Sequence, residues 1–369
     1  MSTTTEDRQA QGQRPQPAMD EHTPWPHALR TAVLAAVAVC VVLLAFAWPS
    51  VTAKIQHLPV AAVGSADQIS QITSKAPAGA LEIRTVASRD DAVDLIRRRD
   101  VYGAIVLGAT PEVLVASAGS PVAAQALTQM GAQMQSQVIA KLQETLAQVA
   151  AKGQSPQSNQ AGQAQQAAAP AAVPQVTVTD VVPLSSDDAR GTGLAVAGLP
   201  LAMGGMIGGV LISLLVSGTW RRLGAILGYG VLSGVGLVGI LQGWFHILQG
   251  NYWTNAGAIG LGIVATAAVI VGLNALIGQP GIAVGAILTL FIGNPLSSLT
   301  QPKEFLPSPW GDVGQWLVPG ASGTLLRDLS YFPDAAMAFP WLVLAGWAVA
   351  GAVLIAVGHF RNAPAVADI

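Results

Sequence analysis

The chain has 369 residues, of which 51% are hydrophobic and only 10% are Asp, Glu, Lys or Arg, and its formal net charge is −2 at pH 7. A water-soluble domain usually carries about 25% charged residues, so this composition excludes a wholly soluble protein. The near-neutral charge also predicts that nucleic acid is not a partner, because binding to phosphates needs a basic surface.

The apolar residues gather in six stretches that hold few or no charges. About 20 apolar residues in a helix cross the hydrocarbon core of a bilayer, which is roughly 30 Å thick. The sequence therefore predicts an α-helical polytopic membrane protein with about six transmembrane helices in contact with the lipid bilayer. The predicted spans are Ala28–Trp48, Leu194–Val216, Leu223–His246, Ala256–Ile277, Ile282–Leu299 and Phe339–Val357.

Basic residues near the ends of the spans predict the orientation of the chain. Arg221 and Arg222 occupy the tightest loop, between the second and third spans, while Arg30 lies at the start of the first span and Arg361 follows the last. Cytoplasmic loops are enriched in Lys and Arg, so both termini are predicted to be cytoplasmic. The first stretch is longer than the core of a signal peptide, which favours an uncleaved anchor over a cleaved signal.

These assignments place a sizeable domain outside the cytoplasm, between the first two spans. The predicted segments are a disordered cytoplasmic tail at 1–27, transmembrane helix 1 at 28–50, the extracytoplasmic domain at 51–192, transmembrane helices 2–5 at 193–300, an outer loop at 301–338, transmembrane helix 6 at 339–358 and a cytoplasmic tail at 359–369.

The segment 51–192 has the pattern of a small α/β domain. Ser65 with Gln68 three residues on is a capping-box pattern that opens a helix. Ser88 opens a second helix, with acidic residues in its first turn and arginines in its last, which complements the helix dipole. Strands alternating with helices indicate an α/β unit. Strands are predicted at Leu58–Gly64, Leu81–Ala87, Tyr102–Gly108, Val113–Ala116 and Gln175–Leu184, and a Gln/Ala-rich linker at Gly153–Ala172.

Two features of this domain allow a sharper and a plainer interpretation. The three arginines at 97–99 could mark a phosphate site, but a solvated helix end paired with Asp94 and Asp100 is favoured. The long predicted helix Val122–Ala150 carries one narrow apolar stripe. The stripe indicates packing on the α/β unit or pairing with the same helix of a partner protomer.

The chain lacks the residue patterns of common catalytic sites. It has no Gly-x-x-x-x-Gly-Lys-Ser/Thr phosphate loop, no His-x-x-x-His or Cys-x-x-Cys spacing for a metal, and no ionisable cluster in the spans for acid–base work. We therefore expect no enzyme activity and no cofactor bound by this chain.

Polar residues and glycines within the predicted spans point to contacts between helices. Glycines at helical spacing, at 204–209 and 224–234, predict close packing, and fit equally well with helices that slide during transport. Polar side chains in the spans are expected to hydrogen-bond neighbouring helices rather than a substrate. They are Gln242, His246, Asn274 and Asn294.

The segment Leu306–Phe332, before the last span, is rich in Trp, Pro and Gly and holds an amphipathic run from Ala321 to Leu329. A plain surface loop rarely exposes so many large apolar side chains. A re-entrant or interfacial helix is favoured over a loop folded against the outer domain. The candidate motif residues are Pro307, Trp310, Gly311, Gln315, Trp316, Pro319, Gly320 and Arg327.

Taken together, these features resemble a known family. The stretch SRDDAVDLIRRRDVYGAIVLG is similar to the outer domain, and PWGDVGQWLVPGASGTLLRDLSYF to the last outer loop, of ATP-binding-cassette type-2 permeases of the phage-infection-protein-like branch. The architecture also resembles that family over most of residues 28–360, since it consists of one span, an outer domain and five clustered spans.

The resemblance implies a homodimeric or heterodimeric permease that exports a hydrophobic or amphipathic substrate. ATP would be bound by a separate ATPase subunit, docked where Arg221 and Arg222 match the position of the family's coupling element. The alternative is a non-transporting envelope scaffold that binds a partner through its outer domain. High Ala and Gly content hints at a bacterial source, so the expected location is a bacterial plasma membrane.

Overall fold

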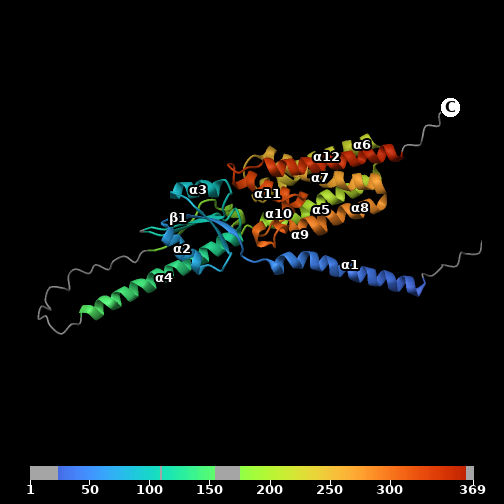
Figure 1. The fold of residues 1–369 in the computed structure, drawn as a ribbon. Helices are drawn as coiled ribbons and strands as arrows, with labels where there is room; N and C mark the ends of the chain where they lie inside the picture. Colours follow the sequence, from blue (N-terminus) through green and yellow to red (C-terminus); the bar gives the residue numbers. More distant parts are fainter. Residues whose placement is uncertain (1–23, 109, 154–174, 363–369) are drawn as a thin grey trace, which may run out of the picture. The chain divides into compact units, whose positions relative to one another are not determined.

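The computed structural model of the chain describes residues 24–108, 110–153 and 175–362 (Figure 1). Most of the tail predicted at 1–27, nearly all of the linker predicted at 153–172 and most of the tail predicted at 359–369 lie outside the described residues. Helix α1 (Trp25–Thr52) begins in a unit that ends at Leu44, and every other element belongs to a second compact unit that starts at Ala45.

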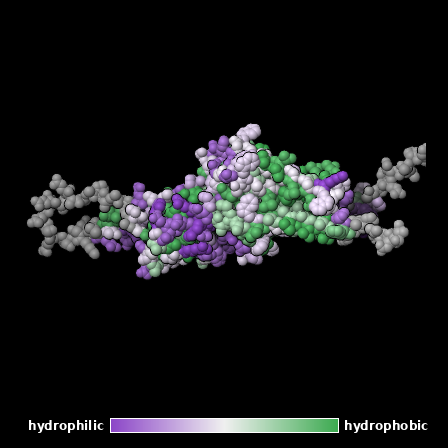
Figure 2. All heavy atoms as spheres, turned by 90° about the horizontal axis from the view of Figure 1, so that it is seen from above, coloured by the Kyte–Doolittle hydropathy of each residue, from purple (hydrophilic) through white to green (hydrophobic). Residues whose placement is uncertain are grey.

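Six helices of the described chain are long and apolar enough to cross a membrane, which confirms the predicted α-helical, multi-pass architecture. Hydrophobic residues gather over these helices, and hydrophilic residues gather over the α/β domain (Figure 2). After α1, the spans are α5 (Thr192–Leu215), α6 (Thr219–Val238) with the π-helical η2 (Gly239–Trp244), α7 (Tyr252–Ile277), α8 (Gln279–Ala286) continued by the π-helical η3 (Ile287–Gly293) and α9 (Asn294–Leu296), and α12 (Ala338–Asn362).

Helix α7 is the centre of the helical bundle, because α5, α6, α8, α12 and the shorter α11 (Val318–Tyr331) all contact it. Glycines allow the closest approaches. A methyl group at Gly234 of α6 would collide with the carbonyl oxygen of Ala256, and one at Gly209 of α5 would press on Ile270. Small residues let helix backbones approach where lipid gives no hydrophobic drive to associate.

The α/β domain is built on one five-stranded sheet with the strand order β2-β1-β3-β4-β5. All pairs are parallel except the antiparallel β3–β4 pair. The capping boxes at Ser65 and Ser88 are both present and open α2 and α3. The elements are β1 (Leu58–Val63), α2 (Ala66–Lys75), β2 (Leu81–Thr85), α3 (Arg89–Arg97), β3 (Gly103–Val106), β4 (Glu112–Val115), α4 (Pro121–Gly153), β5 (Thr177–Asp180) and the 3₁₀ turn η1 (Ser186–Asp188).

The two faces of the sheet have separate cores, since successive strand residues point to opposite sides. In β4, Val113 and Val115 join a core with Leu127 of α4, whereas Leu114 joins a core with Ile96 of α3. Helices α2 and α4 accordingly lie on one side of the sheet and α3 on the other (Figure 1).

The segment between α9 and α12 closes both of these cores. It contains the 3₁₀ turn η4 (Lys303–Phe305), α10 (Trp310–Gln315) and α11. Phe305, 3% exposed, lies in the core shared with α4, and Phe332, 1% exposed, lies in the core shared with α3. The chain after the fifth span therefore completes the domain that precedes the second span.

Candidate functional site

Helices α10 and α11 form a compact pair at the end of the bundle, in the segment that the sequence singled out. Helix α11 contacts the spans α5, α7 and α12. A methyl group at Gly311 would collide with the backbone of Lys303, one at Gly314 with that of Leu296, and one at Gly320 with that of Gly314. Glycine is therefore required for the close approach of α10 to its neighbours.

The remaining motif residues of this segment hold the pair in place. The Gln315 amide donates to the carbonyl of Ser297 (3.3 Å) and accepts a hydrogen bond from the hydroxyl of Thr324 (2.6 Å). Pro319 lies in the first turn of α11, where a missing N–H costs nothing. The Pro307 carbonyl accepts from the Trp310 N–H (2.9 Å), and the Trp310 ring meets the edge of Trp48 at 6.3 Å.

A buried ion pair links α11 to the α/β domain. Arg99 Nη1 donates to Asp328 Oδ1 at 2.6 Å, and the side chains are 16% and 6% exposed. Burial raises the pKa of Asp328, although the attraction of Arg99 opposes this shift. The Arg99 guanidinium also lies over the ring of Phe332, 5.9 Å from its centre.

The prediction of a solvated arginine triplet was wrong for Arg99. Arg98 does pair with Asp100, at 3.6 Å, and both side chains are about half exposed. Arg99, however, follows the end of α3 in the left-handed conformation, with φ of 61°. This turn directs its side chain toward α11, whose Asp328 lies too far along the chain for local spacing to reveal.

Two further polar residues complete the cluster around this ion pair. The Tyr102 hydroxyl donates to Glu304 Oε2 (3.1 Å), and burial raises the pKa of Tyr102. Arg327 Nη2 donates to the carbonyl of Leu299 (2.8 Å), and burial together with the neighbouring Arg99 lowers the pKa of Arg327 to about 10. At neutral pH both arginines stay charged, so the cluster holds opposite charges in contact.

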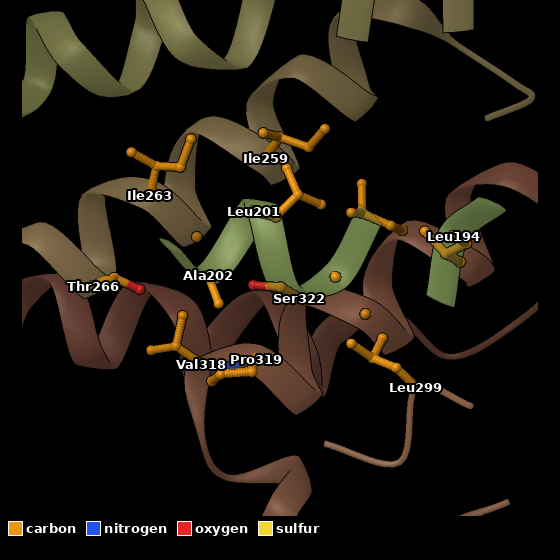
Figure 3. A pocket seen from close by; sticks show the side chains of 14 residues that line it. Leu194, Leu201, Ala202, Ile259, Ile263, Thr266, Leu299, Val318, Pro319 and Ser322 are labelled. Carbon is orange, nitrogen blue, oxygen red and sulfur yellow. The ribbon is translucent and has the colours of Figure 1, made fainter. Parts of the chain in front are cut away.

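A small apolar pocket lies between α5, α7 and α11 (Figure 3). Its volume is about 40 Å³, which leaves room for a few water molecules at most. Leu194 and Leu201 of α5, Ile259 of α7 and Pro319 of α11 line it. In the conformation described, the pocket is too small for any larger molecule.

Arg221 and Arg222 have different environments at the turn between α5 and α6. The sequence predicted that Trp220, Arg221 and Arg222 form the loop between these spans. In the structure the loop is shorter, because all three residues already lie at the start of α6. Arg222 folds back and donates to the carbonyls of Val216 (2.8 Å) and Ser213 (3.3 Å), which caps the end of α5. Arg221 is exposed, so it is the arginine available to a partner.

The polar residues assigned to the spans do not converge on one site. Asn274 donates to the Ser213 carbonyl at the α5 end (3.5 Å), while the buried Oδ1 of Asn294 has no hydrogen-bond partner in the described chain. His246 is exposed and follows η2 rather than lying in the third span, with φ of 51°. The expected third span, Leu223–His246, began four residues late and ended two residues late relative to Thr219–Trp244.

Gln242 belongs to a polar contact with Asn255, and the sequence analysis singled out only Gln242 of the two. Its Oε1 accepts from the amide of Asn255 (2.9 Å), which also donates to the carbonyl of Gln249 (2.8 Å). Asn255 is fully buried. It was overlooked because the predicted fourth span began one residue later, whereas α7 begins at Tyr252 with Asn251 as its cap.

No group of three or more His, Cys, Asp or Glu side chains in the described chain is arranged to hold a metal ion. Comparisons of the chain with protein-family models, with curated proteins and with solved structures gave no match.

Proposed function

We propose that this chain is the membrane permease subunit of an ATP-binding-cassette type-2 exporter, which moves a hydrophobic or amphipathic substrate outward with a separate ATPase subunit. The α/β domain would lie outside the cytoplasm and the turn between α5 and α6 would lie inside. The subunit would work as a homodimer or heterodimer in a bacterial plasma membrane.

The observation that carries this proposal is the position of α11. This helix is too short and too polar at its end to span the membrane, yet it contacts four spans, namely α5, α7, α12 and the η3–α9 part of the fifth span. It is tied to the α/β domain by Arg99 and Asp328. Irregular backbone at membrane depth is tolerated where protein covers it or where it lines a cavity. A movement of the α/β domain would thus be transmitted to a helix between the spans.

The small apolar pocket supports a transport role for the same helix. It is bounded on one side by α11 and on the others by α5 and α7, so a shift of α11 would widen it. Its lining is apolar except for a few polar groups, among them Thr266 and Ser322 (Figure 3). Such a lining suits a hydrophobic or amphipathic substrate.

The energy source would have to be another subunit, because the sequence has no phosphate loop. The exposed Arg221 and the 85% exposed Trp220 beside it offer a docking point at the turn before α6. Arg222 is already used to cap α5, so Arg221 is the better residue to test.

The test is purification from native membranes in mild detergent, followed by an assay of ATP hydrolysis. A stoichiometric ATPase subunit is expected, and Arg221→Glu is expected to release it. Arg190→Glu is the matched control, since Arg190 is exposed just before the opposite end of α5. Recovery of a folded protein with no ATPase, even after chemical cross-linking in the membrane, would overturn the proposal.

An envelope scaffold is the second candidate, and the far half of α4 favours it. Met130 and Met134 pack against the α/β core, but Ile139 and Leu146, farther along the helix, are 39% and 60% exposed. Leu146→Lys should disrupt a complex made through this helix and leave an associated ATPase in place. If Leu146→Lys left every co-purifying partner in place, that result would count against a scaffold.

A further inference from the structure

A groove runs between the α/β domain and the segment from α9 to α12. It consists of two cavities of about 460 and 400 Å³, which share Pro59, Lys303, Glu304 and Asp312. Sites for small ligands usually enclose about 300–1,000 Å³. In contrast to the small apolar pocket among the spans, this groove has room for a small organic molecule.

The cationic side chains that line the groove are already paired with carboxylates. An ammonium or guanidinium group that contacts a carboxylate has little attraction left for an anionic ligand. The pairs are Arg99 with Asp328 (2.6 Å), Lys303 with Asp312 (2.7 Å), Arg98 with Asp100 (3.6 Å) and Arg84 with Glu82 (3.7 Å).

Glu304 is the carboxylate of the groove that has no cation within 4 Å in the described part of the chain. It accepts one hydrogen bond, from the neutral hydroxyl of Tyr102. Arg327, the other buried arginine nearby, directs its guanidinium to the Leu299 carbonyl and does not line the groove. Arg99 attracts Glu304 from beyond contact distance but is itself paired with Asp328, so Glu304 is the carboxylate of the groove that no cation contacts among the described residues.

Two aromatic side chains form a wall of the larger cavity. Trp316 and Phe339 meet edge to face with ring centres 4.9 Å apart, and the Trp347 indole N–H fixes the Trp316 backbone by donating to its carbonyl (2.7 Å). Aromatic faces attract organic cations, most strongly when the cation is poorly hydrated. Aromatic residues at a membrane edge are common by themselves, but here they share a cavity with an unpaired carboxylate.

From this arrangement we propose that the groove binds an organic ammonium ion with an apolar substituent. The ammonium group contacts Glu304, and the apolar group lies against Trp316 and Phe339. An inorganic divalent ion is a poorer fit, since the described residues hold no cluster of three metal-ligating side chains. Binding is independent of export, whereas the idea that such cations are the exported substrate rests on the proposed permease function.

The experiment measures binding of n-hexyltrimethylammonium to the purified full-length protein by isothermal titration calorimetry, with 1-hexanol and hexyl sulfate as uncharged and anionic comparisons. Saturable binding of the cation alone is expected. Glu304→Gln should weaken it by about tenfold or more, because glutamine still accepts from Tyr102 but carries no charge. Glu82→Gln, which alters a paired carboxylate of the same groove, should change it by less than about twofold.

A second variant keeps the test valid if Glu304→Gln folds poorly. Trp316 is 62% exposed, so Trp316→Leu should fold normally and weaken cation binding by about fivefold. The proposal is overturned if the cation shows no saturable binding, if 1-hexanol or hexyl sulfate binds equally well, or if both variants bind as the wild type does. None of these outcomes depends on an ATPase, so they leave the permease proposal to its own test.

Discussion

Arg99 and Asp328 are 229 residues apart in the sequence, and their side chains form a buried ion pair that joins the α/β domain to α11. The pair lies among Tyr102, Arg327 and Phe332. It is a direct polar link between the domain and the helix that contacts the spans.

Removal of one partner should destabilise the protein strongly. Asp328→Asn leaves the Arg99 guanidinium buried without a carboxylate, which typically costs about 3–5 kcal/mol. The double variant Arg99→Met/Asp328→Leu should recover much of that loss, since apolar groups of similar volume need no partner. Thermal unfolding in detergent, followed by tryptophan fluorescence, measures both. Strictly additive effects of the two sites would show that they are not coupled.

The left-handed backbone of Arg99 gives a second prediction that is separate from its charge. Arg99→Ala and Arg99→Gly both remove the guanidinium, but only glycine adopts φ of 61° without steric cost. The glycine variant should therefore be the more stable of the two by about 1 kcal/mol. The comparison uses the same unfolding assay, and equal midpoints would argue that the turn relaxes when its side chain is lost.

The stability of the α/β domain should fall in acid because of Glu112 on β4. Arg89 Nε and Nη2 donate to its carboxylate at 2.7 and 3.0 Å, and this pairing lowers its pKa below the ordinary value of 4.5. A carboxylate with a lowered pKa in the folded state stabilises the fold above the unfolded pKa. That stability is lost as the pH falls through the folded pKa.

Glu112→Gln should consequently lower the midpoint of thermal unfolding at neutral pH and flatten its dependence on pH below about 4.5. Glu82→Gln is a suitable control, because that side chain is 53% exposed and its contact with Arg84 is long, at 3.7 Å. Parallel pH profiles for the wild type and Glu112→Gln would contradict the assignment.

Two glycines in different surroundings test the close packing of α10. A methyl group at Gly314 would collide with the carbonyl of Leu296, so Gly314→Ala should destabilise the α10–α11 pair by about 1–3 kcal/mol. Nothing lies near a methyl at Gly224 on α6, so Gly224→Ala should be neutral or stabilise the helix by up to about 1 kcal/mol. Limited proteolysis of the segment around α10 would report the difference, and equal cleavage would contradict it.

Features that depend on local pattern were the ones that the sequence revealed. Long charge-free stretches identified the six spans. The capping-box pattern at Ser65 identified α2, and Ser88 followed by an acidic first turn and a basic last turn identified α3. The amphipathic run near Ala321 indicated α11. In each case the signal lies within one turn or one helix of the chain.

The residues of the candidate site depend on contacts between distant segments, so the sequence did not reveal them. Asp328 follows Arg327 inside an apolar helix. Two adjacent charges in such a helix indicate buried polar contacts, but they do not identify Arg99 as the partner. Glu304 carries no local signal, because it stands out only by having no contacting cation, and that depends on segments distant in the sequence. The π-helical turns η2 and η3 were not predicted either, because such turns are rare.

Phe305 and Phe332 have a consequence for how the protein is made. Both faces of the α/β sheet are completed by side chains that the ribosome adds only after five of the six spans. Until then each core of the sheet lacks one of its buried aromatic side chains. A fragment of residues 51–192 would lack both side chains permanently. The α/β domain can therefore complete its cores only after the chain between the fifth and sixth spans has been made.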